Sequence, residues 1–403
     1  MKLRASFKKL LIFFLFIGYC SISNGQSLQE QKEFNEAFNT LIKYFKDSED
    51  RNMGEFLRAG IVIDSVNYHF NPPVLWKSGV NSNDDIFTLE VSDNPIALEI
   101  KEIVLENPYG DKFPVSYSVI YEGRLISLFE SGRFVCHSIS SMQRDLSFEK
   151  KINTKNFKYH WIVNNKLVGL SKGKYYYLNT KDKWQKYKEK FPLIDQPKLF
   201  EDDSYISFCD SKYEWGGTVY FYNKATGEMF FTKSTDANTI YVNEGKYYIL
   251  SELGHIGGNS ALKEISNPEL LTPISLEEIR KHPRSSEISA VLKDDKSNAS
   301  RNVFFFRRIG LYSTFNYKGR TIYLTNLNLF NRAFLAEIEN NTVKIVNPLF
   351  NSRIFAHRSL TTTYSDAILI NIVNFNIERK GEVTCIIIKD DQFIKLDWNK
   401  KYH

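Results

Sequence analysis

Cysteine is scarce in this chain, and the compact motifs that mark common enzyme sites are missing from it. Four cysteines among 403 residues exclude a disulfide-dense scaffold. The chain has no P-loop, no dinucleotide-binding glycine fingerprint and no His-Glu-x-x-His motif, and its seven histidines are scattered with no two at ligand spacing. The segment around Ser260 lacks the final glycine of a nucleophile elbow. The sequence therefore predicts no metal site and no cofactor, and it identifies no catalytic residue.

Long apolar runs are also missing after the first 25 residues. With 42% hydrophobic and 25% charged residues, the composition excludes a disordered chain and a polytopic membrane protein. The length is sufficient for two or three average domains, or for one large repetitive β-domain.

Residues 1–25 have the form of a secretory leader. Basic residues precede the apolar run 10–17, and Ser23 and Gly25 occupy the −3 and −1 positions of a small-x-small cleavage site. The apolar run is shorter than the roughly 20 residues that a spanning helix needs. We therefore predict a cleaved signal peptide and a mature chain that starts at Gln26, is secreted or periplasmic, and has no stable membrane span.

Two other roles for this leader stay open. Acylation at Cys20 would make the protein a lipoprotein, although Tyr19 stands where lipoprotein signals need a small residue. An uncleaved anchor is the other alternative.

Removal of the leader changes the charge argument. The chain has 53 Lys and Arg against 47 Asp and Glu, and the leader holds four of the basic residues and no acid, so cleavage lowers the net charge from +6 to +2. A net charge this small gives no reason to expect a nucleic-acid partner. Cleavage also leaves three cysteines, which allow at most one disulfide.

Residues 26–59 are predicted to form a helix and a linker. Ser27 and Glu30 form a capping box. Apolar residues then recur on one helical face over 28–46, at Phe34, Phe38, Leu41, Ile42 and Phe45.

Residues 60–403 have the texture of a repetitive β-structure. Short runs rich in Tyr, Phe, Ile and Val alternate with Gly, Asn, Asp and Lys turns, and similar units recur every 38–42 residues. In two units, Trp215-Gly-Gly and His255-Ile-Gly-Gly align without a gap. A period of about 40–45 residues with several strands is typical of propeller blades. We predict an all-β, propeller-like domain of six to eight blades, with seven favoured. Packed antiparallel sheets or sandwiches are the alternative.

The polar segment 265–302 interrupts this rhythm. It holds three prolines and a second capping box, Ser275 with Glu278. We predict an insertion with a short helix over 275–282, followed by a surface loop over 293–301.

The stretch 181–190 interleaves five lysines with two aromatic residues. A binding patch for an anionic polymer is one interpretation. We favour a solvated edge strand, where lysines prevent edge-to-edge pairing.

The best ligand-binding candidates come from loops of equivalent units. Glu214, Trp215 and His255 are expected on one face of the ring, where the Trp ring could stack on a sugar. The structural interpretation, in which the glycines allow a positive-φ turn and Trp215 caps the sheet, is favoured.

Arginines beside later strands form a second candidate set. Arg307, Arg308, His357 and Arg358 could clamp an anionic group near the axis. Neighbouring residues of a strand point in opposite directions, so at most one of each pair can face the axis. Surface arginines are the favoured interpretation.

These observations favour a binding or scaffold protein of a bacterial envelope that recognises a protein or glycan without catalysis. The alternative is a glycan-active hydrolase or lyase with acids from separate blades, for which Asp210 and Glu214 are the first acids to inspect. Carboxylates about 5–10 Å apart in a central cleft would support it.

Overall fold

The computed structural model describes residues 74–76, 87–187, 192–193, 197–211, 216–253, 259–281, 299–307, 309–327, 333–347, 349, 354, 356, 358–375 and 381–399. The leader and the helix predicted over 28–46 lie outside this set. Among the described residues, no helix is both long and apolar enough to cross a bilayer.

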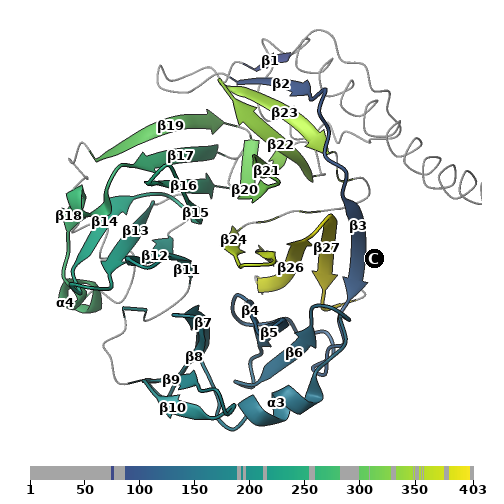
Figure 1. Cartoon of the computed structure of the whole chain (residues 1–403), viewed down its shortest axis with the longest axis vertical. Helices are drawn as coiled ribbons and strands as arrows, with labels where there is room; N and C mark the ends of the chain where they lie inside the picture. Colours follow the sequence, from purple (N-terminus) through teal and green to yellow (C-terminus); the bar gives the residue numbers. More distant parts are fainter. Residues whose placement is uncertain are drawn as a thin grey trace, which may run out of the picture.

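Six small sheets, in which most strands pair antiparallel, follow one another around a ring (Figure 1). We number them as blades 1 to 6 in chain order. Blade 1 consists of β4 (Val119–Tyr121), β5 (Arg124–Leu128) and β6 (Phe134–Ser138). Blade 2 consists of β7 (Tyr159–Val163), β8 (Lys166–Ser171), β9 (Lys174–Leu178) and β10 (Trp184–Lys186). Blade 3 consists of β11 (Lys198–Glu201), β12 (Tyr205–Ser211), β13 (Gly217–Asn223), β14 (Met229–Lys233) and β18 (Thr272–Pro273).

The second half of the ring has the same plan. Blade 4 consists of β15 (Ala237–Asn243), β16 (Lys246–Leu253), β17 (Asn259–Ile265) and β19 (Ser300–Arg307). The main strands of blade 5 are β20 (Ile309–Tyr317), β21 (Arg320–Leu327), β22 (Ala333–Glu339) and β23 (Thr342–Asn347). Those of blade 6 are β24 (Arg358–Thr363), β25 (Ile368–Phe375), β26 (Gly381–Lys389) and β27 (Gln392–Asp397). The chain is a six-bladed β-propeller, which confirms the predicted fold class.

The blade number is six, and the favoured value of seven was wrong. The N-terminal strands extend existing blades instead of building a new one. Strands β1 (Val74–Trp76) and β2 (Phe87–Val91) join blade 5, where β2 runs parallel to β23, and β3 (Glu99–Val104) runs parallel to β27 of blade 6. The repeat period of the sequence assigned this N-terminal stretch to a separate blade, but its strands β1, β2 and β3 form the outer part of blades 5 and 6.

The repeated turn signals of the sequence are two-residue hairpins. Both turn residues have positive φ, which is the signature of the type I′ turn that matches the twist of paired strands. The six pairs are Glu122–Gly123, Asn164–Asn165, Lys172–Gly173, Glu244–Gly245, Lys318–Gly319 and Asn340–Asn341. Gly or Asn at the second position tolerates this conformation, so the turn residues set the length and register of each hairpin.

Apolar side chains fill the space between neighbouring blades. One buried cluster joins blade 6 to blade 1 and so closes the ring, with Leu125 and Val135 packed together with Leu369 and Ile387. The fully buried Asn371 strengthens this closure, since its Oδ1 accepts from the Ser118 N–H at 2.7 Å and its Nδ2 donates to the Ser118 carbonyl at 3.1 Å. Closure therefore depends on residues about 250 positions apart.

Two short α-helices of the described residues lie outside the blades. Helix α4 (Leu276–Lys281) begins with the predicted capping box, because Ser275 Oγ accepts from the Glu278 N–H and Glu278 Oε2 accepts from the Ser275 N–H. The loop predicted over 293–301 is cut short, since β19 begins at Ser300. Helix α3 (Leu146–Ile152) was not predicted, and it packs beside β6 in the three-stranded blade 1.

Candidate functional site

Buried charged groups gather near the axis, where the inner strands β15 and β24 contact each other. Asp236 immediately precedes β15 and is 7% exposed, and Glu252 on β16 is 3% exposed. Arg358 begins β24 of blade 6. These three side chains line a cavity with about 20 Å³ of space for the centre of a water molecule, together with Tyr117, Pro197, Cys209, Ala237, Asn238 and Ser359. We call Asp236, Glu252 and Arg358 the axial cluster.

Strand pairing places the two acids next to each other. The Glu252 N–H donates to the Asp236 carbonyl at 3.2 Å, one step beyond the Ala237–Ser251 pair of β15 and β16. Directly opposed residues of an antiparallel pair share one face. Asp236 has a φ of +47°, which Asp tolerates better than most residues. A Cβ at Gly310 would lie 3.4 Å from Glu252 Oε1, so this glycine in blade 5 leaves room for the carboxyl.

Burial dominates the electrostatics of the axial cluster. It raises the pKa of Asp236 to about 6, and the nearby Arg358 opposes this rise, with 3.7 Å between Arg358 Nε and Asp236 Oδ1. Burial also raises the pKa of Glu252 well above its usual range, and the Asp236 charge raises it further. Burial therefore favours the protonated form of both carboxyls, and the nearby Arg358 favours the ionised form of Asp236.

Chemically, this arrangement can hold a proton and a small polar molecule. Among the described residues, neither Asp236 Oδ1 nor Glu252 Oε1 has a hydrogen-bond partner. A cavity of about 10–15 Å³ in this measure can hold one water, so this one has room for it. Pockets that bind small organic ligands span roughly 300–1,000 Å³. The axial cavity is too small for a sugar ring.

Of the residues predicted from sequence, the structure brings only Arg358 into this site. Its side chain is 26% exposed and faces the cavity. Glu214, Trp215, His255, Arg308 and His357 lie outside the described residues. The backbone of Arg307 pairs with Asn259 in blade 4, and its side chain lies outside the described set.

The repeat alignment behind those candidates nevertheless has a structural counterpart. Strands β13 and β17, which follow the Trp215 and His255 connections, are both the third strands of their blades. Gly216 has a φ of +100°, and a Cβ at Gly217 would lie 2.6 Å from the Ser234 carbonyl oxygen. Gly216 thus has the positive φ that the structural interpretation expected, and Gly217 has a different reason to be glycine, its close approach to the backbone; Trp215 lies outside the described residues.

The two acids of the axial cluster were missed in the sequence. Each is a single carboxylate without a motif, and Asp236 lies in a turn. The one available signal was Glu252, a charge inside the strand Lys246–Leu253. Asp210, named as an acid to inspect, instead accepts a hydrogen bond from the Thr218 N–H at 2.8 Å within blade 3.

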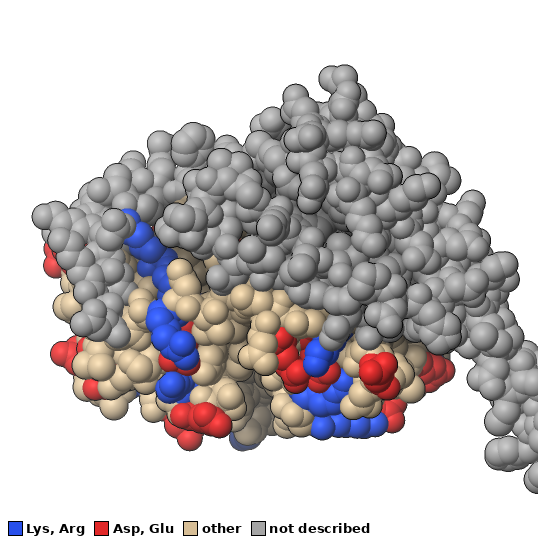
Figure 2. All heavy atoms as spheres, turned by 90° about the horizontal axis from the view of Figure 1, so that it is seen from above, with Lys and Arg blue, Asp and Glu red and all other residues tan. Residues whose placement is uncertain are grey.

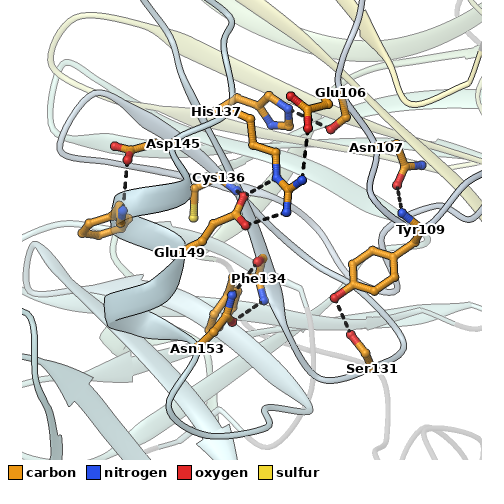
Figure 3. Close-up of polar contacts among 12 residues, drawn as sticks. Glu106, Asn107, Tyr109, Ser131, Phe134, Cys136, His137, Asp145, Glu149 and Asn153 are labelled. Atoms are coloured by element: carbon orange, nitrogen blue, oxygen red, sulfur yellow. Dashed lines mark hydrogen bonds and ion pairs between the residues drawn. The ribbon is translucent and has the colours of Figure 1, made fainter.

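A second polar network surrounds α3 at the edge of blade 1 (Figure 3). Arg144 donates to both carboxylate oxygens of Glu149 at 2.8 Å and to Glu106 at 3.1 Å. Glu149 also accepts from the Cys136 N–H at 3.0 Å. These bonds fasten the helix to β6, because the carboxylate of Glu149 is used entirely inside the protein. We interpret this network as structural.

Cys136, Cys209 and Cys385 are free and buried, so none of the three forms a disulfide. Burial raises the pKa of each thiol. Within the described residues, no group of three or more His, Cys, Asp or Glu side chains could hold a metal ion.

The chain matches no protein-family model and no curated protein. Its similarity to solved structures is remote. The match to the N-terminal domain of Nup159 covers 76% of this chain and 78% of that chain, with 9% identity and a TM-score of 0.29. The match to Hsv2 from Kluyveromyces marxianus covers 68% of this chain and 82% of that chain, with 9% identity and a TM-score of 0.29. The match to BamB from Moraxella catarrhalis has the same coverages and identity and a TM-score of 0.25. Scores this low carry no argument about function, and the assignment as a six-bladed β-propeller rests on the sheets of this chain.

Proposed function

We propose that the protein is a secreted or periplasmic propeller of a bacterial envelope that binds or scaffolds a protein or glycan without catalysis. A closed ring of sheets is a rigid support that presents loops and blade edges to partners, which suits this role. The predicted leader supports the location. Cell fractionation with N-terminal sequencing tests that part, and a product that starts at Gln26 is the expected result.

The observation that carries the non-catalytic proposal is the burial of the axial cluster. Asp236 and Glu252 are 7% and 3% exposed, and the cavity beside them has space for one water. A carboxylate pair that cleaves a glycan must reach the glycosidic bond from both sides. These two acids cannot do so in the described arrangement.

Thermal unfolding of the mature chain, residues 26–403, tests the binding function. The panel contains envelope glycans, cell-wall fragments and divalent ions. A ligand that binds only the folded state at a hundredfold excess over Kd stabilises it by about 2.7 kcal/mol. A shift with one ligand class supports binding, and the absence of any shift directs the search to protein partners by pull-down from envelope extract. Failure of both would refute the proposal.

A glycan-active hydrolase or lyase is the second candidate, because the axial cluster has one feature that favours it. The feature is a pair of adjacent carboxyls whose pKa values burial raises, which suits a general acid, and catalysis would require the axial cavity to open beyond its described size. Release of reducing or unsaturated ends from a glycan panel, abolished by Glu252→Gln and by Asp236→Asn, would establish this activity and overturn the binding proposal.

A further inference from the structure

The lysines of blade 2 form a surface of one sign. Residues 155–187 contain eight lysines and a single acid, Asp182. That acid is paired with Lys151 of α3 at 2.6 Å. We call these eight residues the lysine surface: Lys155, Lys158, Lys166, Lys172, Lys174, Lys181, Lys183 and Lys186. All of them except Lys155 are exposed.

Elsewhere in the described part of the chain, basic side chains are commonly paired with acids. Arg320 is bound by Glu337, and Lys318 by Asp391. Viewed from the side of β1, β2 and β19, the ring shows Lys and Arg side chains close to Asp and Glu (Figure 2). Blade 2 lies on the opposite side of the ring (Figure 1). No described acid forms an ion pair with any member of the lysine surface. Within the described residues, its charge is therefore not neutralised by acidic side chains.

Protection of an edge strand explains only part of this charge. Strand β10 is the outer edge of blade 2, as predicted, and a lysine such as Lys186 would discourage pairing with another chain. Lys166 and Lys174, however, begin the interior strands β8 and β9. Like charges that gather on one small blade repel one another and favour a bound polyanion.

Tyrosine rings hold several of these ammonium groups in place. Lys155 Nζ lies 4.7 Å from the centre of the Tyr176 ring. Lys186 of β10 is directly opposite Tyr176 of β9, and Lys174 lies two residues before Tyr176 on β9. The side chains of Tyr176, Lys186 and Lys174 therefore lie on one face of the blade. Lys166 Nζ lies 4.9 Å from the Tyr177 ring on the other face. Contacts with aromatic faces attract cations and reduce the freedom that binding must remove.

The residue types favour a flexible, repeating polyanion over one fixed anionic group. Residues 155–187 contain no arginine, the residue whose planar fork recognises one fixed phosphate or carboxylate. Lysines act as point charges on flexible stems, and they are spread over both faces and the turns of the blade. A linear polyanion can meet such a distribution in several registers.

We propose that the lysine surface binds an acidic polysaccharide. The inference rests on the proposed binding function and names its surface and partner class. The probe is polygalacturonate, measured by calorimetry with the mature chain, residues 26–403, at several salt concentrations. We expect binding that weakens steadily with salt, and no binding of neutral dextran.

A charge-matched pair of variants locates the site. The test variant carries Lys155→Gln, Lys174→Gln and Lys186→Gln. The control variant removes the same charge from blades 5 and 6, where each lysine has an acidic partner: Lys318→Gln, Lys344→Gln and Lys389→Gln. We expect at least tenfold weaker polygalacturonate binding in the test variant and less than a twofold change in the control. Hydrogen exchange of the unsubstituted chain gives a second measurement, with protection expected within 155–187.

Several outcomes would overturn the inference. Equal weakening in both variants would mean that only net charge matters, and protection outside blade 2 would place the site elsewhere. Polyglutamate or double-stranded DNA bound as tightly as polygalacturonate would refute the polysaccharide class. If the unsubstituted chain does not bind polygalacturonate, and both variants still capture a partner from envelope extract, the lysine surface is rejected and the proposed binding function stands.

Discussion

Replacement of Asp236 by Asn should change how stability depends on pH. The folded protein keeps the Asp236 proton up to about pH 6, whereas the unfolded chain releases it near the ordinary pKa of 3.8. Between these values the folded state binds more protons than the unfolded state, so stability falls as pH rises. The stabilising contribution of the protonated carboxyl is complete below pH 3.8 and is lost by the time the pH has passed 6.

The magnitude follows from the folded-state and unfolded-state pKa values of Asp236. A rise from 3.8 to about 6 corresponds to about 3 kcal/mol, at 1.36 kcal/mol for each tenfold change in proton affinity. Asp236 is 7% exposed, so solvent screens little of this cost. The unfolding free energy of the unsubstituted protein, minus that of Asp236→Asn, should therefore fall by about 3 kcal/mol between pH 3.5 and pH 7. Carboxyls with lowered pKa values, such as Glu264, are present in both proteins and cancel in this difference.

Urea unfolding followed by tryptophan fluorescence at closely spaced pH values measures this difference. The control is Asp366→Asn, because Asp366 makes only an exposed ion pair with Lys389, worth about 0–1 kcal/mol. Glu252→Gln should gain stability relative to the unsubstituted protein as pH rises, since the high pKa of Glu252 has the same cause. A difference for Asp236→Asn that stays flat, or that rises between pH 4 and pH 6, would refute the assignment of Asp236 as a buried acid.

Three further outcomes are expected. Asp145→Ala should lower the free energy of unfolding by about 1 kcal/mol in chemical denaturation, because the Asp145 side chain caps α3 at the Phe148 N–H. The hydrogen bond from Arg124 lowers the pKa of Asp145 to about 2. The stabilisation by this carboxylate is therefore present above pH 3.8 and is lost as pH falls through 2. Gly217→Ala should lower stability by about 1–3 kcal/mol, since its Cβ would meet two carbonyl oxygens at 2.6 and 2.8 Å; an unchanged unfolding midpoint would contradict this contact. A thiol reagent should leave the native mature chain unmodified and label three groups after unfolding, and labelling before unfolding would contradict the buried positions of Cys136, Cys209 and Cys385.

Local features of the fold could be predicted from the sequence because short-range chemistry controls them. The Gly and Asn turns determine the hairpins, as at Lys172–Gly173, and the capping box at Ser275 determines the start of α4. The recurrence of these signals also predicted a ring of similar sheets. Helix α3 was missed because its seven residues are too few to establish a helical period.

The blade number and the axial cluster depended on the tertiary structure. Six blades result because β2 and β3 pair in parallel with β23 and β27, strands more than 250 residues away, and no local pattern specifies such pairing. Asp236, Glu252 and Arg358 form a cluster because ring closure brings blade 4 to blade 6 across the axis. The sequence by itself thus determined the strands, their turns and their repetition. Only the closed ring decided which isolated charges became buried neighbours, because their pKa values depend on packing around an axis to which distant segments contribute.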